Sequence, residues 1–125
     1  MSIFVVWEKP RRDLLHIVYR PGWTYEDFER ARHKARQMLD HAPQKLDLVI
    51  DQQLVRFSQG DFLLHAELMT EVTQHPKVRR TIVLGVPQHL MPPRRAGGRE
   101  NSLFHNYIFA LSMDEAYDLL MMASV

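Results

Sequence analysis

The stretch Thr81-Ile82-Val83-Leu84-Gly85-Val86 is nearly all apolar, as a central β-strand covered on both faces would be. An earlier run, Leu46-Asp47-Leu48-Val49-Ile50-Asp51, also predicts a strand. Between these two strands, the spacing of apolar residues predicts a helix over about Asp61 to Gln74. The wide apolar face of this helix consists of Phe62, Leu64, Leu68, Met69 and Val72. Because strands alternate with helices here, we expect the strands to pair in parallel.

The beginning of the chain predicts a β-hairpin. Ile3 to Glu8 and Leu14 to Tyr19 are runs rich in β-branched, aromatic and aliphatic residues, and the polar turn Lys9-Pro10-Arg11-Arg12-Asp13 separates them. Two strands joined by so short a connection are most simply antiparallel. Pro21-Gly22 ends the second strand. The sheet is therefore predicted to be mixed, with one antiparallel pair at its start.

The first helix has clear start and stop signals. Thr24 is a good N-cap, and Asp27 places a carboxylate in the first turn, where the helix dipole favours it. Trp23 and Phe28 occupy the positions of a hydrophobic staple, and Pro43 stops the helix. One apolar stripe at spacings of three and four consists of Phe28, Ala31, Ala35, Met38, Leu39 and Ala42.

The last part of the chain predicts a strand and a helix. Asn106 to Ala110 is the strand, and Ser112 with Glu115 has the form of a capping box. Pro87 to His105 is irregular, and we expect both of its ends to be anchored on the core while Pro92 to Asn101 is exposed and mobile. The predicted order is β-β-α-β-α-β-β-α in one α/β domain over residues 1–125.

Composition excludes several kinds of chemistry. The chain has no cysteine, so disulfides, thiolate nucleophiles and cysteine-ligated zinc are absent. The net charge of +1 gives no long-range field that would attract nucleic acid or an acidic membrane. Met1 to Pro10 has no basic leader, and no apolar run approaches the roughly 18 residues of a membrane span. We expect a soluble, cytoplasmic protein without a membrane partner.

Several stretches in this order resemble a known superfamily. They are the opening hairpin, Gly22-Trp23-Thr24-Tyr25-Glu26-Asp27, Asp47 to Asp51, His75-Pro76 before Thr81 to Gly85, and Leu111 to Ala116 before the last helix. Together they resemble the STAS superfamily, and within it the SpoIIAA-like branch of small prokaryotic proteins. The resemblance implies a mixed sheet with helices beside it. It also implies a non-catalytic regulatory module that binds partner proteins, nucleotides or lipids.

The resemblance also points to one serine. In the anti-sigma-factor antagonists of the superfamily, a serine in an Asp-Ser-Ser-Gly motif at the start of the second helix is phosphorylated. Here the corresponding stretch is Arg56-Phe57-Ser58-Gln59-Gly60, which keeps Ser58 and Gly60 but lacks the aspartate and the second serine. Ser58 is therefore either a phosphoacceptor or a helix cap or loop residue. We expect no working phosphoserine switch.

Asp51 ends a predicted buried strand. Ligand sites of open α/β sheets lie beyond the carboxyl ends of their strands. Asp51 could hold a ligand or metal there, or it could accept hydrogen bonds from the loop that follows. The alternative to a protein-interaction domain is accordingly a small-ligand domain that binds a nucleotide or lipid in a pocket near Asp51 and Val86.

Arg94, Arg95 and Arg99 flank Gly97-Gly98 in the irregular segment. They could bind an anionic group of a partner, or they could belong to a solvated loop. The chain has no Walker motif, no Gly-x-Gly-x-x-Gly and no RNA-recognition signature. A nucleic-acid accessory protein is therefore the least favoured of the three functional classes.

Metal binding and catalysis have little support in the sequence. The seven histidines include no pair at helical i, i+4 spacing and no His-Glu-x-x-His. There is no Gly-x-Ser-x-Gly motif, and no acid–base pair is identifiable from spacing. We expect a binding domain rather than an enzyme, without a cofactor or metal. Its partner is predicted to be a protein of unknown identity, with a homodimer and a small ligand left open.

Overall fold

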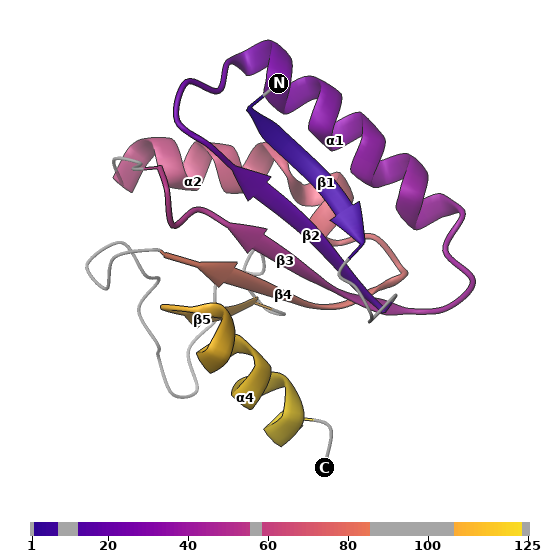
Figure 1. Cartoon of the computed structure of the whole chain (residues 1–125). Helices are drawn as coiled ribbons and strands as arrows, with labels where there is room; N and C mark the ends of the chain where they lie inside the picture. The colour runs from indigo at the N-terminus through magenta and orange to yellow at the C-terminus, as the bar shows by residue number, and fades with distance from the viewer. Residues whose placement is uncertain (1, 8–12, 56–58, 86–106, 124–125) are drawn as a thin grey trace.

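A five-stranded sheet organises the chain, in the strand order β1-β2-β3-β4-β5. In this computed structural model the described residues are 2–7, 13–55, 59–85 and 107–123 (Figure 1). The strands are β1 (Ile3–Trp7), β2 (Leu14–Tyr19), β3 (Leu46–Asp51), β4 (Val78–Leu84) and β5 (Tyr107–Ala110). The helices are α1 (Tyr25–Asp40), α2 (Gln59–Leu68), α3 (Thr70–Thr73) and α4 (Met113–Ala123).

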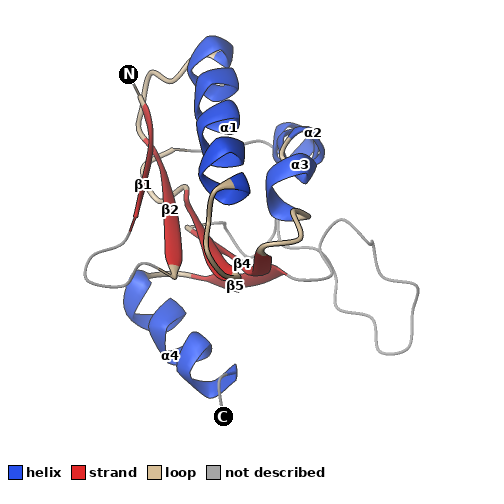
Figure 2. Cartoon of the chain, turned by 90° about the vertical axis from the view of Figure 1, so that its right-hand side faces the viewer, coloured by secondary structure: helices blue, strands red, loops and turns tan. Residues whose placement is uncertain are grey.

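The sheet is mixed, as the sequence predicts. β1 pairs antiparallel with β2, whereas β2, β3, β4 and β5 pair in parallel and in chain order. Helices α1, α2 and α3 lie on one face of the sheet and α4 lies on the other (Figure 2). Parallel strands that follow one another in chain order need crossovers of one hand, so their connecting helices share a face.

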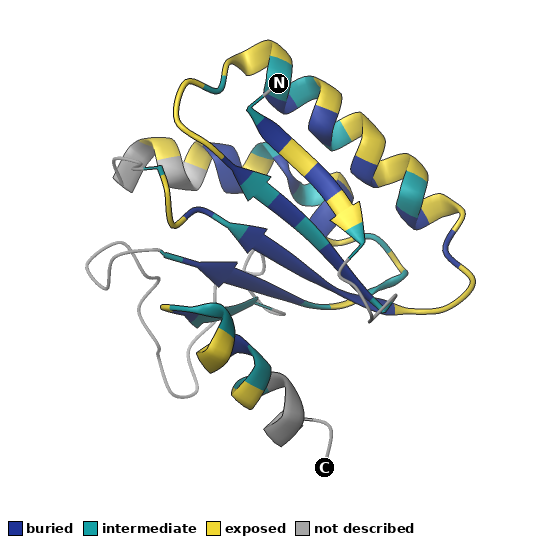
Figure 3. Ribbon diagram, viewed as in Figure 1, coloured by how far each residue is buried: buried dark blue, intermediate teal, exposed yellow. Residues whose placement is uncertain are grey.

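Two apolar clusters hold the layers together. The larger lies between the sheet and α1, α2 and α3, and includes Leu48, Ile50 and Phe28. The smaller lies on the α4 side and consists of Leu14, Val49, Ile82, Leu84, Ala110 and Ala116. Alternate residues of β3 therefore serve opposite clusters, and this strand is buried on both faces (Figure 3). The predicted central strand is likewise buried from Thr81 to Leu84.

Helix α1 begins as its sequence predicts. The Thr24 hydroxyl accepts a hydrogen bond from the Asp27 backbone N–H at 3.1 Å, and Asp27 Oδ2 accepts one from the Thr24 N–H at 3.1 Å. The buried residues Phe28, Ala31, Ala35 and Leu39 form its inner face, and the helix ends at Asp40, before Pro43. The reciprocal cap leaves two fewer unpaired donors at the helix start.

The second predicted helix is corrected in two respects. It begins earlier, at Gln59, and divides at Met69 into α2 and α3. The Thr70 hydroxyl donates to the Glu67 carbonyl at 2.9 Å, a back-bond of the kind that bends helices. Leu64, predicted on the apolar face, is 57% exposed. Of the other predicted residues, Met69 and Val72 are buried and Leu68 packs against the core, while the side chain of Phe62 lies outside the described residues. The buried residues of α2 and α3 also include His65, Ala66 and Thr73.

The bounds of β4 also differ from prediction. β4 starts at Val78 and ends at Leu84, one residue before Gly85, which has a φ of +82°. β5 starts at Tyr107. Ser112 caps α4 by accepting from the Glu115 N–H at 3.2 Å, while the Glu115 carboxylate accepts from the Leu111 N–H at 3.4 Å. The segment Pro87 to His105 lies outside the described residues.

Candidate functional site

The parallel strands β2, β3, β4 and β5 end at one edge of the sheet, which we call the C-terminal edge (Figure 1). The loops that lead into α1 and α2, and the short link from β5 to α4, leave the sheet there. Binding sites of open α/β sheets lie beyond this kind of edge, because the loops can vary without disturbing the core. The edge is therefore the first place to seek a site.

Asp51 lies at the C-terminal edge and binds its own loop. Its Oδ1 accepts hydrogen bonds from the Gln53 backbone N–H at 3.0 Å and from the Gln53 side-chain amide at 3.1 Å. Its Oδ2 lies 3.6 Å from His16 Nε2 on the neighbouring strand. Of the two predicted roles of Asp51, this geometry favours the structural one, which is to accept hydrogen bonds from the loop.

Gly85 sets the distance between two loops of the C-terminal edge. A Cβ at Gly85 would lie 2.6 Å from the Gln53 Cα, closer than real Cβ atoms come to a neighbour. Its φ of +82° also favours glycine. The β3–α2 loop therefore rests directly on the end of β4, and the backbone at this point has little freedom to move.

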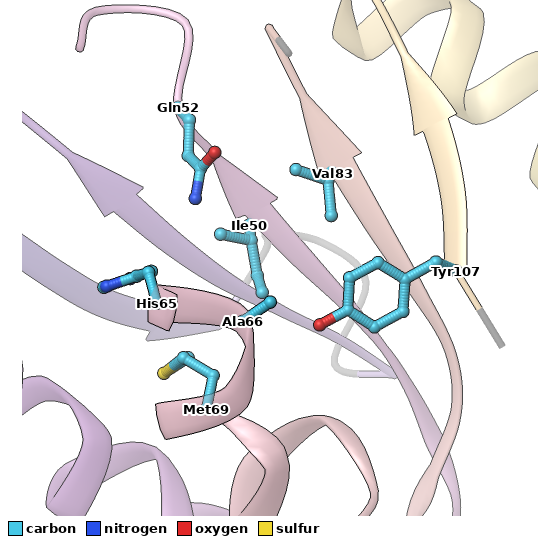
Figure 4. A pocket seen from close by; sticks show the side chains of 7 residues that line it. All are labelled: Ile50, Gln52, His65, Ala66, Met69, Val83 and Tyr107. Atoms are coloured by element: carbon cyan, nitrogen blue, oxygen red, sulfur yellow. The ribbon is translucent and has the colours of Figure 1, made fainter. Parts of the chain in front are cut away.

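A hollow lies beside Gln52, between the ends of the strands and α2 (Figure 4). It is lined by Ile50, Gln52, His65, Ala66, Met69, Val83 and Tyr107. Its interior has room for about one water molecule, whereas pockets for drug-sized ligands measure about 300–1,000 Å³. Gln52 Oε1 is buried here without a hydrogen-bond partner among the described residues. As it stands, this hollow cannot hold a nucleotide or a lipid.

His65, which lines the hollow, forms a buried polar pair with Tyr19. The Tyr19 hydroxyl is hydrogen-bonded to His65 Nε2. Trp23 and Phe28 also pack against the imidazole, with ring centroids 5.5 and 4.4 Å from its own. Burial lowers the pKa of His65 to about 4 and raises the pKa of Tyr19 above its usual value. Both groups are therefore neutral at pH 7, so the pair binds two elements together without introducing a charge.

Tyr107 places a phenol in the lining of the hollow. Burial raises the pKa of Tyr107 to about 12, and its hydrogen bond with Thr73 opposes the shift. Its hydroxyl points toward the hollow in Figure 4. At neutral pH this group is a hydrogen-bonding phenol and not a phenolate.

The opposite edge of the sheet holds a cluster that sequence reasoning missed. Asp47 is buried, and Arg80 donates to its two oxygens at 3.1 and 2.9 Å, while Arg79 donates to Oδ2 at 3.3 Å. Asp13 lies 3.7 Å from Arg79. We call these four residues the N-terminal edge cluster. An aspartate inside the apolar run Leu46–Asp51 was a signal for it, since a buried carboxylate requires partners.

Three large apolar side chains are exposed in the segments that follow the C-terminal ends of parallel strands. Tyr25, Leu54 and Leu111 are 63%, 60% and 64% exposed, and each follows the end of a different parallel strand. We call these three residues the edge patch. The other large apolar residues that are exposed in the described part of the chain are Phe4 and Val6 on β1 and Leu64 on α2. None of them lies at the N-terminal edge of the parallel strands.

Several predicted site residues lie outside the described part of the chain. These residues are Ser58, Val86, Arg94, Arg95 and Arg99. Among the residues that the structure does describe, no group of three or more histidines and carboxylates could hold a metal ion. No helix among them is long and apolar enough to cross a membrane.

No protein-family model matches the chain, and a search of curated proteins finds no relative.

Proposed function

We propose that this chain is a non-catalytic, STAS-like regulatory domain that binds a partner protein through the C-terminal edge of its sheet. The observation that carries the proposal is the edge patch of Tyr25, Leu54 and Leu111. The resemblance to the STAS superfamily implies a mixed sheet with helices packed beside it, and the sheet of this chain is mixed. The phosphoserine switch forms no part of the proposal.

The apolar character of the edge patch favours a protein partner. Single exposed apolar residues are common and need no explanation, but here three of them follow the ends of parallel strands. Aromatic anchors such as Tyr supply much of the energy at protein interfaces and are surrounded by contacts that exclude water, whereas a nucleic-acid surface would be basic. The hollow beside Gln52 admits about one water. A protein surface therefore fits the described geometry better than a small ligand does.

The proposal assigns no chemistry to the polar groups at this edge. Asp51 is engaged by Gln53, and the pKa values of His65 and Tyr107 leave both side chains neutral at pH 7. A general base must be unprotonated and within reach of a substrate proton. Neutral His65 meets the first condition, but it is buried and hydrogen-bonded to Tyr19. These groups act as structural supports of the edge.

The test is affinity capture from the native host with three forms of the chain. The edge variant carries Tyr25→Ser, Leu54→Ser and Leu111→Ser. The control variant carries Lys34→Ser and Gln37→Ser on the exposed side of α1. We expect one protein to co-elute with the wild type and the control, and its recovery to fall at least about tenfold with the edge variant, since losing a contact hot spot costs about 2 kcal/mol or more.

Equal recovery of every co-eluting protein with the wild type and the edge variant would refute this surface. A small molecule that co-purifies with all three forms, seen by native mass spectrometry, would favour the ligand-binding alternative instead. Circular dichroism of each variant checks that all three forms are folded before the capture is compared.

A further inference from the structure

The outer edge of β1 is a second, independent surface. β1 is the first strand in the sheet order, so one of its sides pairs with β2 and the other side meets no described strand. Figure 2 shows β1 at the margin of the sheet, away from α2 and α3. An edge strand presents a row of unpaired N–H and C=O groups, which can pair with another chain.

The register of the hairpin shows which backbone groups face outward. The Arg20 N–H donates to the Ser2 carbonyl at 2.8 Å, so these opposed residues are a hydrogen-bonded pair. In an antiparallel ladder, hydrogen-bonded pairs alternate with non-hydrogen-bonded ones. Phe4↔Val18 and Val6↔His16 are therefore hydrogen-bonded pairs. The backbone groups of Ile3, Val5 and Trp7 point away from β2.

β1 lacks the devices that usually protect an edge strand. Ile3–Trp7 reads IFVVW, without charge, proline or glycine. Phe4 and Val6 are 38% and 46% exposed on the face opposite α1. The Arg20 guanidinium lies 5.2 Å from the centre of the Phe4 ring and covers it only in part. Both the backbone and the side chains of this strand are thus suited to an apolar strand partner.

We propose that two copies of this chain pair through β1, antiparallel about a two-fold axis at Val5, and form one continuous sheet. Ile3 then lies opposite the partner's Trp7, and Val5 lies opposite the partner's Val5. These are the residues whose backbone groups face outward, so each copy both donates and accepts across the axis. Two-fold symmetry of this kind is the commonest arrangement of protein dimers.

The side chains fit the same register. Phe4 lies opposite the partner's Val6 on the open face, which makes two aromatic–aliphatic cross-strand pairs related by the axis. No charged side chain within Ile3–Trp7 is buried by the pairing. A shift of one residue would bring inward-facing backbone groups to the interface and turn every side chain to the wrong face. A second copy is therefore a self-complementary partner for this strand.

The first test is the mass of the wild-type protein by light scattering over a dilution series. We expect twice the chain mass at high concentration. The variant Phe4→Lys/Val6→Lys places like charges opposite each other across the axis and should weaken the dimer at least about tenfold. The variant Phe4→Glu/Val6→Glu should do the same, while an equimolar mixture of the two should restore the dimer. Leu64→Lys, at an exposed position of α2, is the matched control and should leave the dimer intact.

The second test reads the register directly and uses the absence of cysteine from the chain. Opposed residues of a non-hydrogen-bonded antiparallel pair have Cα atoms about 4.5 Å apart, within disulfide range. A mixture of Phe4→Cys and Val6→Cys chains should therefore give a mixed disulfide-linked dimer under mild oxidation. Each variant alone should cross-link several-fold less, because its own thiols are diagonal to each other.

Three results would overturn the proposal. They are a single-chain mass at every concentration, a dimer unaffected by Phe4→Lys/Val6→Lys, and cross-linking that is as efficient for Phe4→Cys alone as for the mixture. These measurements use purified protein and do not involve the edge patch. The dimer can therefore fail while the proposed partner surface stands, and the reverse also holds.

Discussion

The N-terminal and C-terminal edges of the parallel strands differ in the kinds of side chain that they carry. At the N-terminal edge, Asp47 is buried and Arg80 and Arg79 neutralise it. At the C-terminal edge, Asp51 is partly exposed and bound by its own loop, and the edge patch lies in solvent. At the N-terminal edge the buried carboxylate is paired with arginines, whereas at the C-terminal edge large apolar side chains are exposed to solvent. We therefore expect the N-terminal edge to contribute more to stability, while the C-terminal edge is the surface that we propose for binding.

Other contacts also stabilise the N-terminal edge. Lys77 donates to the Ala42 carbonyl at 2.6 Å, and the Asp47 backbone N–H donates to the Asp13 carbonyl at 2.9 Å. Asp40, at the end of α1, lies 2.8 Å from His75, and this hydrogen bond lowers the pKa of its carboxyl group. Loops from three parts of the chain are thus bound together at the N-terminal edge.

The largest loss of stability should come from removing the buried carboxylate of the N-terminal edge. Asp47→Ala leaves two arginines without their buried acceptor and should lower the free energy of unfolding by about 4 kcal/mol. Asp51→Ala is the matched change at the open edge and should cost about 1 kcal/mol, because it removes hydrogen bonds from an exposed loop. Urea denaturation measures both. Equal losses would contradict the difference that we draw between the edges.

The second effect concerns pH and the buried His65. Its folded pKa of about 4 lies below the usual histidine value of 6.5. Between these values the unfolded chain binds a proton that the folded protein does not, so stability falls as the pH drops from 6.5 toward 4. The loss should reach about 3 kcal/mol at the lower end. Denaturation at several pH values measures it.

His65→Gln provides the control for the pH effect, since an amide can still hydrogen-bond to Tyr19 but does not titrate. The slope of stability against pH in this window should flatten in the variant. A slope unchanged from wild type would assign the effect to other groups.

The third effect concerns the close approach of Gly85 to Gln53. Gly85→Ala should cost about 2 kcal/mol or more, from the positive φ together with the steric clash. Gly22 has a φ of +86° but nothing within 4 Å of its added Cβ. Gly22→Ala should therefore cost only about 1 kcal/mol, and the difference between the two variants measures the loop contact. Thermal unfolding would show it as two distinct shifts of Tm.

The smallest effect is expected at the edge patch. Leu54→Ser removes a side chain that is 60% exposed, and the free energy of unfolding should change by less than about 0.5 kcal/mol. The same holds for Leu111→Ser. A loss above 2 kcal/mol would mean that these residues support the fold, and it would weaken their assignment to binding.

Much of the fold could be predicted from local patterns. The Thr24 cap, the opening hairpin and the mixed sheet were predicted, because capping and strand periodicity depend on neighbouring residues. The site was predicted less well. Asp51 was found at the expected edge, but the sequence left open whether it holds a ligand or metal or accepts hydrogen bonds from the loop that follows. Ser58, Arg94, Arg95 and Arg99 stay predictions, and so does the STAS resemblance.

The sequence by itself determined the elements of this protein, since apolar spacing and caps act over a few residues. Only the tertiary structure decided which side chains meet. Asp47 is 33 residues from Arg80, and Tyr19 is 46 residues from His65. The exposure of Leu64 likewise depends on how α2 packs against the sheet. Pairings between distant residues follow from strand order and register, which local sequence patterns do not specify.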